Sequence, residues 1–280
     1  MIKLKRTYLF VLITSLLILL ISCNFKGQGP GNTIKIKGSY TMFNLGNQWA
    51  SEFMATHPGI SIYVDGGGSA TGFKGLFDGD VDIAMASRLI RSEEASELAE
   101  KYNSIGLSFL VAKDALSIFL NRQNPVDNLS LEEVRKIFTG EITNWAEVGG
   151  NDEAIDVVIR PSTSGTHFYL KEFVLDEAEY TEDAEILPTN SAVVEYVLNH
   201  KNAIGYGGIA AEQTVRHCMI NGIAATEQNV GNDKYLLTRY LYLYTINTPS
   251  GRIKEFIDWV MSPAGQRIVK EVGFVPLWNE

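Results

Sequence analysis

Cysteine and clustered positive charge are both scarce in this chain. Its 280 residues include two cysteines, Cys23 and Cys218, too few for a disulfide framework or for a zinc site built on cysteine. No basic stretch follows the first few residues and the formal charge is −9, so nucleic acid is not expected as a partner. The four histidines show no HExxH or other metal-ligand spacing. We therefore expect no metal and no cofactor.

The composition is that of a folded globular protein. Apolar residues make up 45% and charged residues 20%, so the chain can bury a substantial core. A length of 280 residues allows one large domain or two of ordinary size. The excess of acidic residues, taken alone, argues against an anionic ligand. Net charge, however, governs solubility and long-range steering rather than a buried site made of local dipoles.

The N-terminus is predicted to be a leader. Three basic residues precede an apolar stretch at 8–21, which is short for a membrane span and ends at Ser22. The Leu-Ile-Ser before Cys23 resembles the lipobox of bacterial lipoproteins, whose cysteine becomes the lipidated N-terminus; the alternative is an ordinary cleavage site with a cysteine nearby. We expect a signal peptide at 1–22 and a tether at 23–32, lipidated by palmitate or similar acyl chains. The mature protein would be exported and held at the outer face of the cell membrane, or at the membrane face of the periplasm.

Strand and helix patterns alternate through the rest of the chain, which favours an α/β fold with largely parallel strands. Helices are expected around Trp49 and Phe73, after the capping box of Ser130 and Glu133, and after Ser262. The predicted strands are 33–37, 60–65, 81–87, 105–111, 116–121, 156–160, 203–206 and 240–245.

Three strand-to-helix turns share one chemistry. They read GSYT at 38–41, GGGSATG at 66–72 and RPSTSGT at 160–166. Each places hydroxyls and main-chain N–H groups at a helix N-terminus, where the helix dipole favours an anion. Any one of them is explained by ordinary helix capping. The three together, with Arg160 supplying a fork of donors, favour a tetrahedral oxyanion. None carries the Gly-Lys-Ser/Thr of a P-loop, and the glycines lack dinucleotide-site spacing.

In this order the three turns resemble the PstS-type phosphate-binding proteins of bacterial ABC phosphate importers. The stretch DVDIAMASR at 80–88 carries the resemblance together with the turns, and the supporting stretches are DNLSLEEVRKIFTGEITNW at 127–145 and AIGYGG at 203–208. The resemblance spans essentially the whole mature chain. It implies a binding protein that captures inorganic phosphate and delivers it to the permease and ATPase subunits of an importer. It also implies the periplasmic-binding-protein fold of type II, with the ligand between two lobes joined by two crossing strands.

The resemblance also implies which residues bind phosphate. The first two turns and the neighbouring stretch would contribute from one lobe, while the third turn would supply Arg160 and further donors from the other. The implied residues are Ser39, Thr41, Ser69, Ser87, Arg88, Arg160, Ser164, Gly165 and Thr166. The implied lobes are 33–114 with 240–280, and 115–239.

One position departs from the family pattern. Many members carry an aspartate in the stretch that borders the site, just after its serine, where it accepts the proton of phosphate and so rejects sulfate. Here the matching residue is Ser87 or Arg88. A serine discriminates less sharply, because its hydroxyl both donates and accepts. A ligating Arg88 would favour a more highly charged anion. Asp65 and Asp82 are other possible acceptors, each also explained as a residue at a strand end.

Three alternatives remain open from the sequence. Sulfate or molybdate would use the same fold and the same donors. A hydrolase using Ser164 and His167 is conceivable, although no GxSxG elbow is present. An adhesin or sensor built on this scaffold would use its tyrosines as a surface, but Tyr240, Tyr242 and Tyr244 alternate as one face of a strand does.

Overall fold

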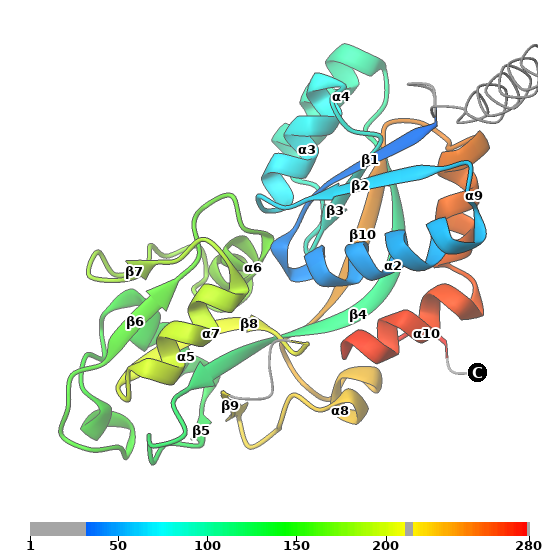
Figure 1. Cartoon of the computed structure of the whole chain (residues 1–280). Helices are drawn as coiled ribbons and strands as arrows, with labels where there is room; N and C mark the ends of the chain where they lie inside the picture. The colour runs from blue at the N-terminus through cyan, green and yellow to red at the C-terminus, as the bar shows by residue number, and fades with distance from the viewer. Residues whose placement is uncertain (1–31, 211–214, 279–280) are drawn as a thin grey trace, which may run out of the picture.

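The structure, a computed structural model, describes residues 32–210 and 215–278, which form two lobes side by side (Figure 1). The expected leader, Cys23 and all of the tether except Asn32 lie outside the described residues. Among the residues described, no helix is long and apolar enough to cross a membrane.

The first lobe is a sheet of order β2–β1–β3–β10–β4, where β4 is Leu107–Leu120. In it β1 runs parallel to β2 and β3, while β10 is antiparallel to its neighbours. Its strands other than β4 are β1 (Thr33–Gly38), β2 (Ser61–Asp65), β3 (Ile83–Ala86) and β10 (Thr238–Thr245). Its helices are η2 (Tyr40–Met42), α2 (Phe43–Thr56), α3 (Ser69–Asp78), α4 (Ser92–Tyr102), α9 (Gly251–Val260) and α10 (Pro263–Val272).

The second lobe continues the sheet from β4 through β8 and β6 to β7, with β8 parallel to β6. Its strands are β5 (Asn128–Leu129), β6 (Asp156–Ile159), β7 (Glu185–Ile186), β8 (Ala203–Gly208) and β9 (Arg216–Ile220). Its helices are α5 (Leu131–Thr139), η3 (Trp145–Val148), α6 (Gly165–Phe173), α7 (Asn190–Asn199) and α8 (Glu227–Gly231).

Two neighbouring strands connect the lobes. The long strand β4 (Leu107–Leu120) pairs with β10 over its first half and with β8 and β9 over its last residues. The chain returns through β10, which lies antiparallel beside β4. In Figure 1, β4 extends from the first lobe into the second. The sequence pattern splits β4 into two predicted strands, because Lys113 and Asp114 interrupt an otherwise apolar run.

Local sequence signals account for several helix boundaries. The Ser130 hydroxyl oxygen accepts a hydrogen bond from the main-chain N–H of Glu133, and the Glu133 carboxylate accepts one from the main-chain N–H of Ser130. This is the capping box that the sequence pattern predicts. Gly140 then ends α5 in a left-handed conformation with φ 81°. In the last helix, Ser262 is the N-cap and proline follows at the first helical position.

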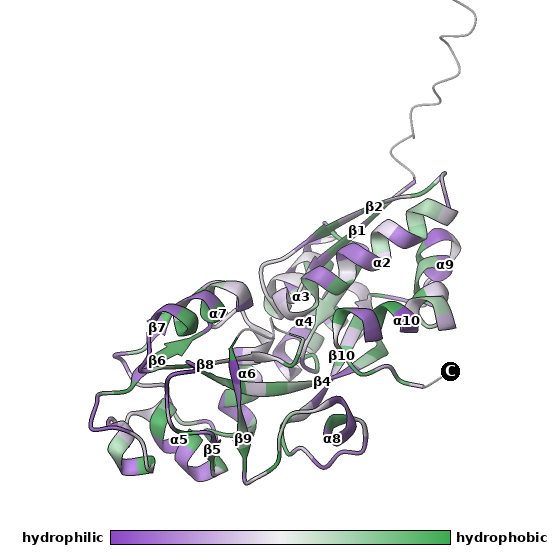
Figure 2. Ribbon diagram, turned by 60° about the horizontal axis from the view of Figure 1, so that its bottom comes forward, coloured by the Kyte–Doolittle hydropathy of each residue, from purple (hydrophilic) through white to green (hydrophobic). Residues whose placement is uncertain are grey.

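Each lobe buries its own apolar core. Trp49 and Phe53 of α2 pack with Phe256 of α9 against one face of the first sheet. Phe138 and Tyr206 lie edge to face in the core of the second lobe. Hydrophobic and hydrophilic residues alternate along the covering helices in Figure 2, as expected where one side of a helix packs on a sheet. Cys218 is buried in the second core, which raises its pKa to about 12, and it behaves as a small apolar residue.

Candidate functional site

The three turns picked out in the sequence converge where the lobes meet. Within the first lobe, the Ser39 hydroxyl donates to Ser87 Oγ at 3.1 Å, and the Ser87 main-chain N–H donates to Ser69 Oγ at 3.1 Å. All three serines are buried. The main-chain N–H of Ser39 also donates to Met85 of β3, which fixes the first turn beside the stretch ending at Ser87. The first lobe thus presents a compact set of hydroxyls.

The second lobe meets this set through the loop before α6. The hydroxyls of Thr41 and Thr166 lie 3.1 Å apart across the junction, and the Ala70 N–H donates to the Thr163 carbonyl at 3.2 Å. Ser164 is the N-cap of α6 and accepts from the main-chain N–H groups of Thr166 and His167. The positive end of the α6 dipole therefore points at the hydroxyls of the first lobe.

Arg160 is the buried cation of the second lobe. Its guanidinium donates to the Pro188 carbonyl at 2.8 Å and to the side chain of Asn190, while its main-chain N–H donates to the hydroxyl of Tyr206. Arg160 is 1% exposed, and its Nε has no hydrogen-bond partner within the described part of the chain. Burial lowers the pKa of Arg160 to about 10, so the side chain stays charged at neutral pH. Such a donor suits an anion.

Arg88 is held differently. Its two terminal nitrogens donate to the Glu94 carboxylate at 2.7 and 2.6 Å, within the first lobe. The guanidinium carbon lies 5.0 Å from the ring centre of Phe73 and 5.3 Å from that of Phe168. Its Nε, like that of Arg160, is buried with no hydrogen-bond partner among the described residues. The Glu94 carboxylate offsets the charge that Arg88 would bring to an anion.

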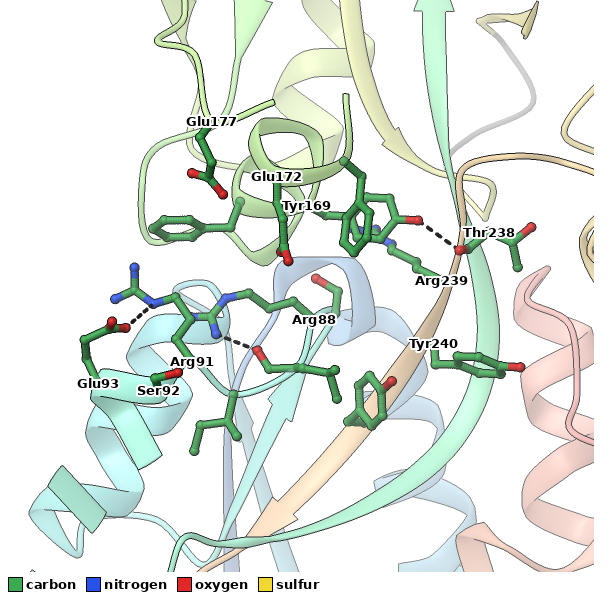
Figure 3. Close-up of a pocket in the computed structure, with 16 residues that line it drawn as sticks. Arg88, Arg91, Ser92, Glu93, Tyr169, Glu172, Glu177, Thr238, Arg239 and Tyr240 are labelled. Carbon is green, nitrogen blue, oxygen red and sulfur yellow. Dashed lines mark hydrogen bonds and ion pairs between the residues drawn. The ribbon is translucent and has the colours of Figure 1, made fainter. Parts of the chain in front are cut away.

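A cavity of about 650 Å³ opens beside these buried groups (Figure 3). Arg88 and Arg91 line it from the first lobe and Glu172 from α6 of the second, while Arg239 lies on β10 between them. The cavity is lined by side chains of both charge signs, and its glutamates disfavour a second anion there. The fixed donors lie deeper, at the meeting of the three turns.

Two charged residues that the sequence analysis did not select complete the junction. Asp114 of β4 and Arg239 of β10 face each other in the sheet and are both buried, with 2.7 Å between Arg239 Nη2 and Asp114 Oδ2. Burial raises the pKa of Asp114, and the Arg239 guanidinium opposes that shift. Their sequence signal is the presence of charged residues in the two long apolar runs that cross between the lobes: Lys113 and Asp114 in the first run, and Arg239 in the second.

The possible proton acceptors named from the sequence lie elsewhere. Asp65 pairs with Lys37 at 2.9 Å, and Asp82 accepts from the main chain of Lys35 and lies 3.9 Å from Arg252. Both carboxylates are partly exposed and occupied by first-lobe partners. Neither contacts the hydroxyls at the junction in any hydrogen bond of the structure described.

The chain is similar to known proteins of one family. The chain matches the PBP superfamily domain over residues 26–264. It is 30% identical to the phosphate-binding protein PstS of Pseudomonas aeruginosa, over 90% of this chain and 85% of that protein. PstS of Borreliella burgdorferi is 29% identical over 95% and 96% of the two chains. The chain belongs to the PstS-type phosphate-binding family.

A solved member of this family gives the same fold. The crystal structure from Clostridium perfringens, described as a phosphate ABC transporter substrate-binding protein with bound phosphate, superposes with a TM-score of 0.80. It shares 31% identity and covers 88% of this chain and 100% of its own. The fold predicted from the sequence, a two-lobed α/β binding protein, is confirmed.

Membership of the PstS-type family makes the chain a binding protein and not an enzyme. The geometry of Ser164 and His167 agrees. The Ser164 oxygen accepts the main-chain N–H of His167 at 3.4 Å, while the imidazole Nδ1 is bonded to the Arg160 carbonyl at 2.8 Å. The serine acts as a helix cap, and the histidine supports the arginine loop rather than a nucleophile.

Proposed function

We propose that this chain captures inorganic phosphate between its lobes and delivers it to the permease and ATPase of an ABC importer. One observation carries the proposal: the buried guanidinium of Arg160, whose Nε has no hydrogen-bond partner among the described residues, donates to Asn190. Asn190 donates in turn to Thr41, where hydroxyls of both lobes meet. A guanidinium, which is charged and carries several N–H donors, suits a tetrahedral oxyanion when neutral hydroxyl donors lie beside it. The relatives named above are phosphate-binding proteins, and one was solved with phosphate bound.

In this proposal the first lobe binds phosphate and the second closes over it. The proposed ligands are the residues that the family resemblance implies: Ser39, Thr41, Ser69, Ser87, Arg88, Arg160, Ser164, Gly165 and Thr166. The proposed lobe boundaries are 33–114 with 240–280, and 115–239. Because phosphate would contact both lobes, it would stabilise the closed form. That closed form would be what the importer recognises.

The test is titration calorimetry with inorganic phosphate. Replacing Arg160 by Ala should weaken binding by at least about tenfold, because a charge-assisted hydrogen bond is lost from a buried site. The control is Arg135→Ala, which removes an arginine that pairs with Glu132 on the outer face of α5. It should leave phosphate affinity unchanged. Equal affinity of wild type and Arg160→Ala would contradict the proposed site.

A second oxyanion is the alternative ligand. The carboxylates suggested as proton acceptors, Asp65 and Asp82, are engaged elsewhere, and the buried Asp114 is bound to Arg239. A site whose candidate carboxylates are all paired in the described part of the chain has less means of rejecting sulfate, which offers no proton at neutral pH. Competition of labelled phosphate by sulfate and by molybdate distinguishes these ligands. Displacement by sulfate at equal concentration would assign the site to oxyanions in general.

We propose further that the mature protein begins at Cys23 and is anchored by acyl chains outside the cytoplasm. The proposal rests on the lipobox-like residues before Cys23 and on the polar tether after it. Mass spectrometry of the N-terminal peptide, with Cys23→Ala as control, tests it. An unmodified Cys23 in membrane-derived protein would contradict it.

A further inference from the structure

The ion pair between the crossing strands reaches hydroxyls of both lobes. Arg239 Nε and Nη2 both donate to Asp114 Oδ2, at 2.8 and 2.7 Å. The other carboxylate oxygen, Oδ1, accepts from the Ile209 N–H at 3.1 Å. Arg239 is 3% exposed and Asp114 is fully buried. The carboxylate therefore fixes the guanidinium plane from one side.

The remaining donors of Arg239 point at the junction. Nη1 donates to Thr166 Oγ1 at 3.1 Å, and Nη2 donates to Thr41 Oγ1 at 3.5 Å. Thr41 belongs to the first lobe and Thr166 to α6 of the second. The other two buried arginines do not bridge the lobes by hydrogen bonds: Arg88 binds first-lobe partners and Arg160 binds second-lobe partners in the part of the chain described. Arg239 thus links the strand pair β4–β10 to one hydroxyl of each lobe, Thr41 of the first and Thr166 of the second.

The contacts with Arg239 determine the direction in which the Thr41 and Thr166 hydroxyls can donate a hydrogen bond. A threonine hydroxyl carries one hydrogen and accepts through its oxygen. When its oxygen accepts from a guanidinium, the hydrogen is directed away from the arginine, and the charged donor makes the hydroxyl a stronger donor. In this structure the two hydroxyls are also hydrogen-bonded to each other at 3.1 Å, with either as the donor. An oxyanion that enters between the lobes would replace that bond, and both O–H groups would then donate to it. Asp114 neutralises Arg239, so Arg160 retains the net charge of the site.

We propose that Asp114 and Arg239 are a positioning pair, which orients the Thr41 and Thr166 hydroxyls toward the bound oxyanion and couples its binding to lobe closure. This inference rests on the proposed function, because it takes the oxyanion site as given. It adds two residues outside the three turns, and it makes the strand pair β4–β10 part of the binding machinery rather than only a connection. A purely structural ion pair would affect unfolding but would not act through Thr166.

A double-mutant cycle separates these roles. The variant Asp114→Asn/Arg239→Gln removes both charges together, since removing one partner alone leaves a buried unpaired charge. We expect it to weaken inorganic phosphate binding by about tenfold in calorimetry. Thr166→Val should also weaken binding in the wild-type background. In the Asp114→Asn/Arg239→Gln background it should have little further effect, because the hydroxyl is no longer oriented.

Arg216→Gln is the matched control. Arg216 is a partly buried arginine of the second lobe whose guanidinium donates to main-chain carbonyls, including those of Asn124 and Val126. Its replacement should affect thermal unfolding without changing phosphate affinity. The inference is overturned if the paired variant binds phosphate within about twofold of wild type, or if Thr166→Val costs the same in both backgrounds.

Two further outcomes are distinguishable. If wild-type protein binds no phosphate, the proposed function fails rather than the positioning role, and the same cycle is run with sulfate or molybdate. If circular dichroism shows that the paired variant does not fold, Arg239→Lys replaces it. Lysine keeps the charge opposite Asp114 but lacks the planar fork that reaches both threonines. Wild-type affinity in Arg239→Lys would overturn the inference, and a loss that is absent from Arg216→Gln would support it.

Discussion

Gly165 lies where any side chain would force the two lobes apart. A Cβ at this position would stand 2.3 Å from Ser69 Oγ and 2.6 Å from Ser87 Oγ, closer than such atoms approach in proteins. Gly68 has the reciprocal role in the first lobe, since a Cβ there would lie 2.3 Å from the Thr163 carbonyl. At the residue scale, the site depends on small side chains that allow hydroxyls and main chain to meet.

Replacing Gly165 by Ala should weaken phosphate binding by about tenfold or more, because overpacking of this kind costs about 1–3 kcal/mol. Thermal unfolding should change little, since the contact lies between the lobes rather than within either core. Gly59→Ala is the control, because a Cβ there meets nothing within 4 Å. Calorimetry showing equal phosphate affinity for Gly165→Ala and Gly59→Ala would refute this account of closure.

Serine caps two helices of the second lobe at very different places. Ser130 caps α5 on the outer surface, and Ser164 caps α6 at the junction of the lobes. The same local chemistry begins both helices, so sequence alone identifies the caps but not which of them faces a ligand. At the element scale, the placement of the helix decides whether a cap also belongs to a site.

A pair of serine variants tests this distinction. Ser130→Ala and Ser164→Ala should each lower the free energy of unfolding by about 1 kcal/mol, because each removes an N-cap hydrogen bond. Only Ser164→Ala should also weaken phosphate binding. Urea denaturation and calorimetry measure the two effects separately. A loss of phosphate affinity in Ser130→Ala would show that remote stability, rather than the site, controls binding.

At the scale of the whole molecule, two cores are joined by the strand pair β4–β10. Each lobe has its own buried apolar cluster, while the site lies between them and is made of polar groups. Relative motion of the lobes can therefore open the site without exposing either core. Two histidines of the second lobe, His167 and His217, make the free energy of unfolding depend on pH.

The stability of the fold should fall as the pH drops below about 6.5. Burial lowers the pKa of His167 and of His217 from the usual 6.5, so the folded protein binds their protons less readily than the unfolded chain. The contribution of the two neutral histidines to the free energy of unfolding is fully present above the pKa that they have in the unfolded chain. It is lost as the pH falls through their lower pKa in the folded protein. Urea denaturation at about pH 7.5 and about pH 5.5 measures this.

The matched variant is His167→Gln/His217→Gln, which has no imidazole at either position. The decrease in the free energy of unfolding between the two pH values should be smaller in the variant than in wild type, since carboxylates titrate equally in both. Parallel pH profiles would show that neither histidine contributes.

Much of the fold was predictable because its signals are local. The capping box at Ser130, the Ser-Pro start of the last helix and the apolar spacing of α2 all concern neighbours in the chain. The strands β5 and β7 were not predicted, because two residues carry no periodic pattern. The strand β9 was not predicted either, because it begins with the polar residues Arg216 and His217. The boundary within β4 was also missed, since the charge of Asp114 breaks the apolar run that the tertiary structure keeps as one strand.

The class of the protein, the helix caps and the three turns whose hydroxyls meet at the junction could all be predicted without coordinates, because each depends on residues close together in the chain. The partners of the arginines could not be predicted in this way, because they come from distant parts of the chain. Arg88 is bound to Glu94, Arg160 is bound to Pro188 and Asn190 of its own lobe, and Arg239 joins Asp114 to hydroxyls of both lobes. A guanidinium carries the same charge everywhere in a sequence. Which carboxylate or hydroxyl lies beside it depends on contacts between residues up to 198 positions apart.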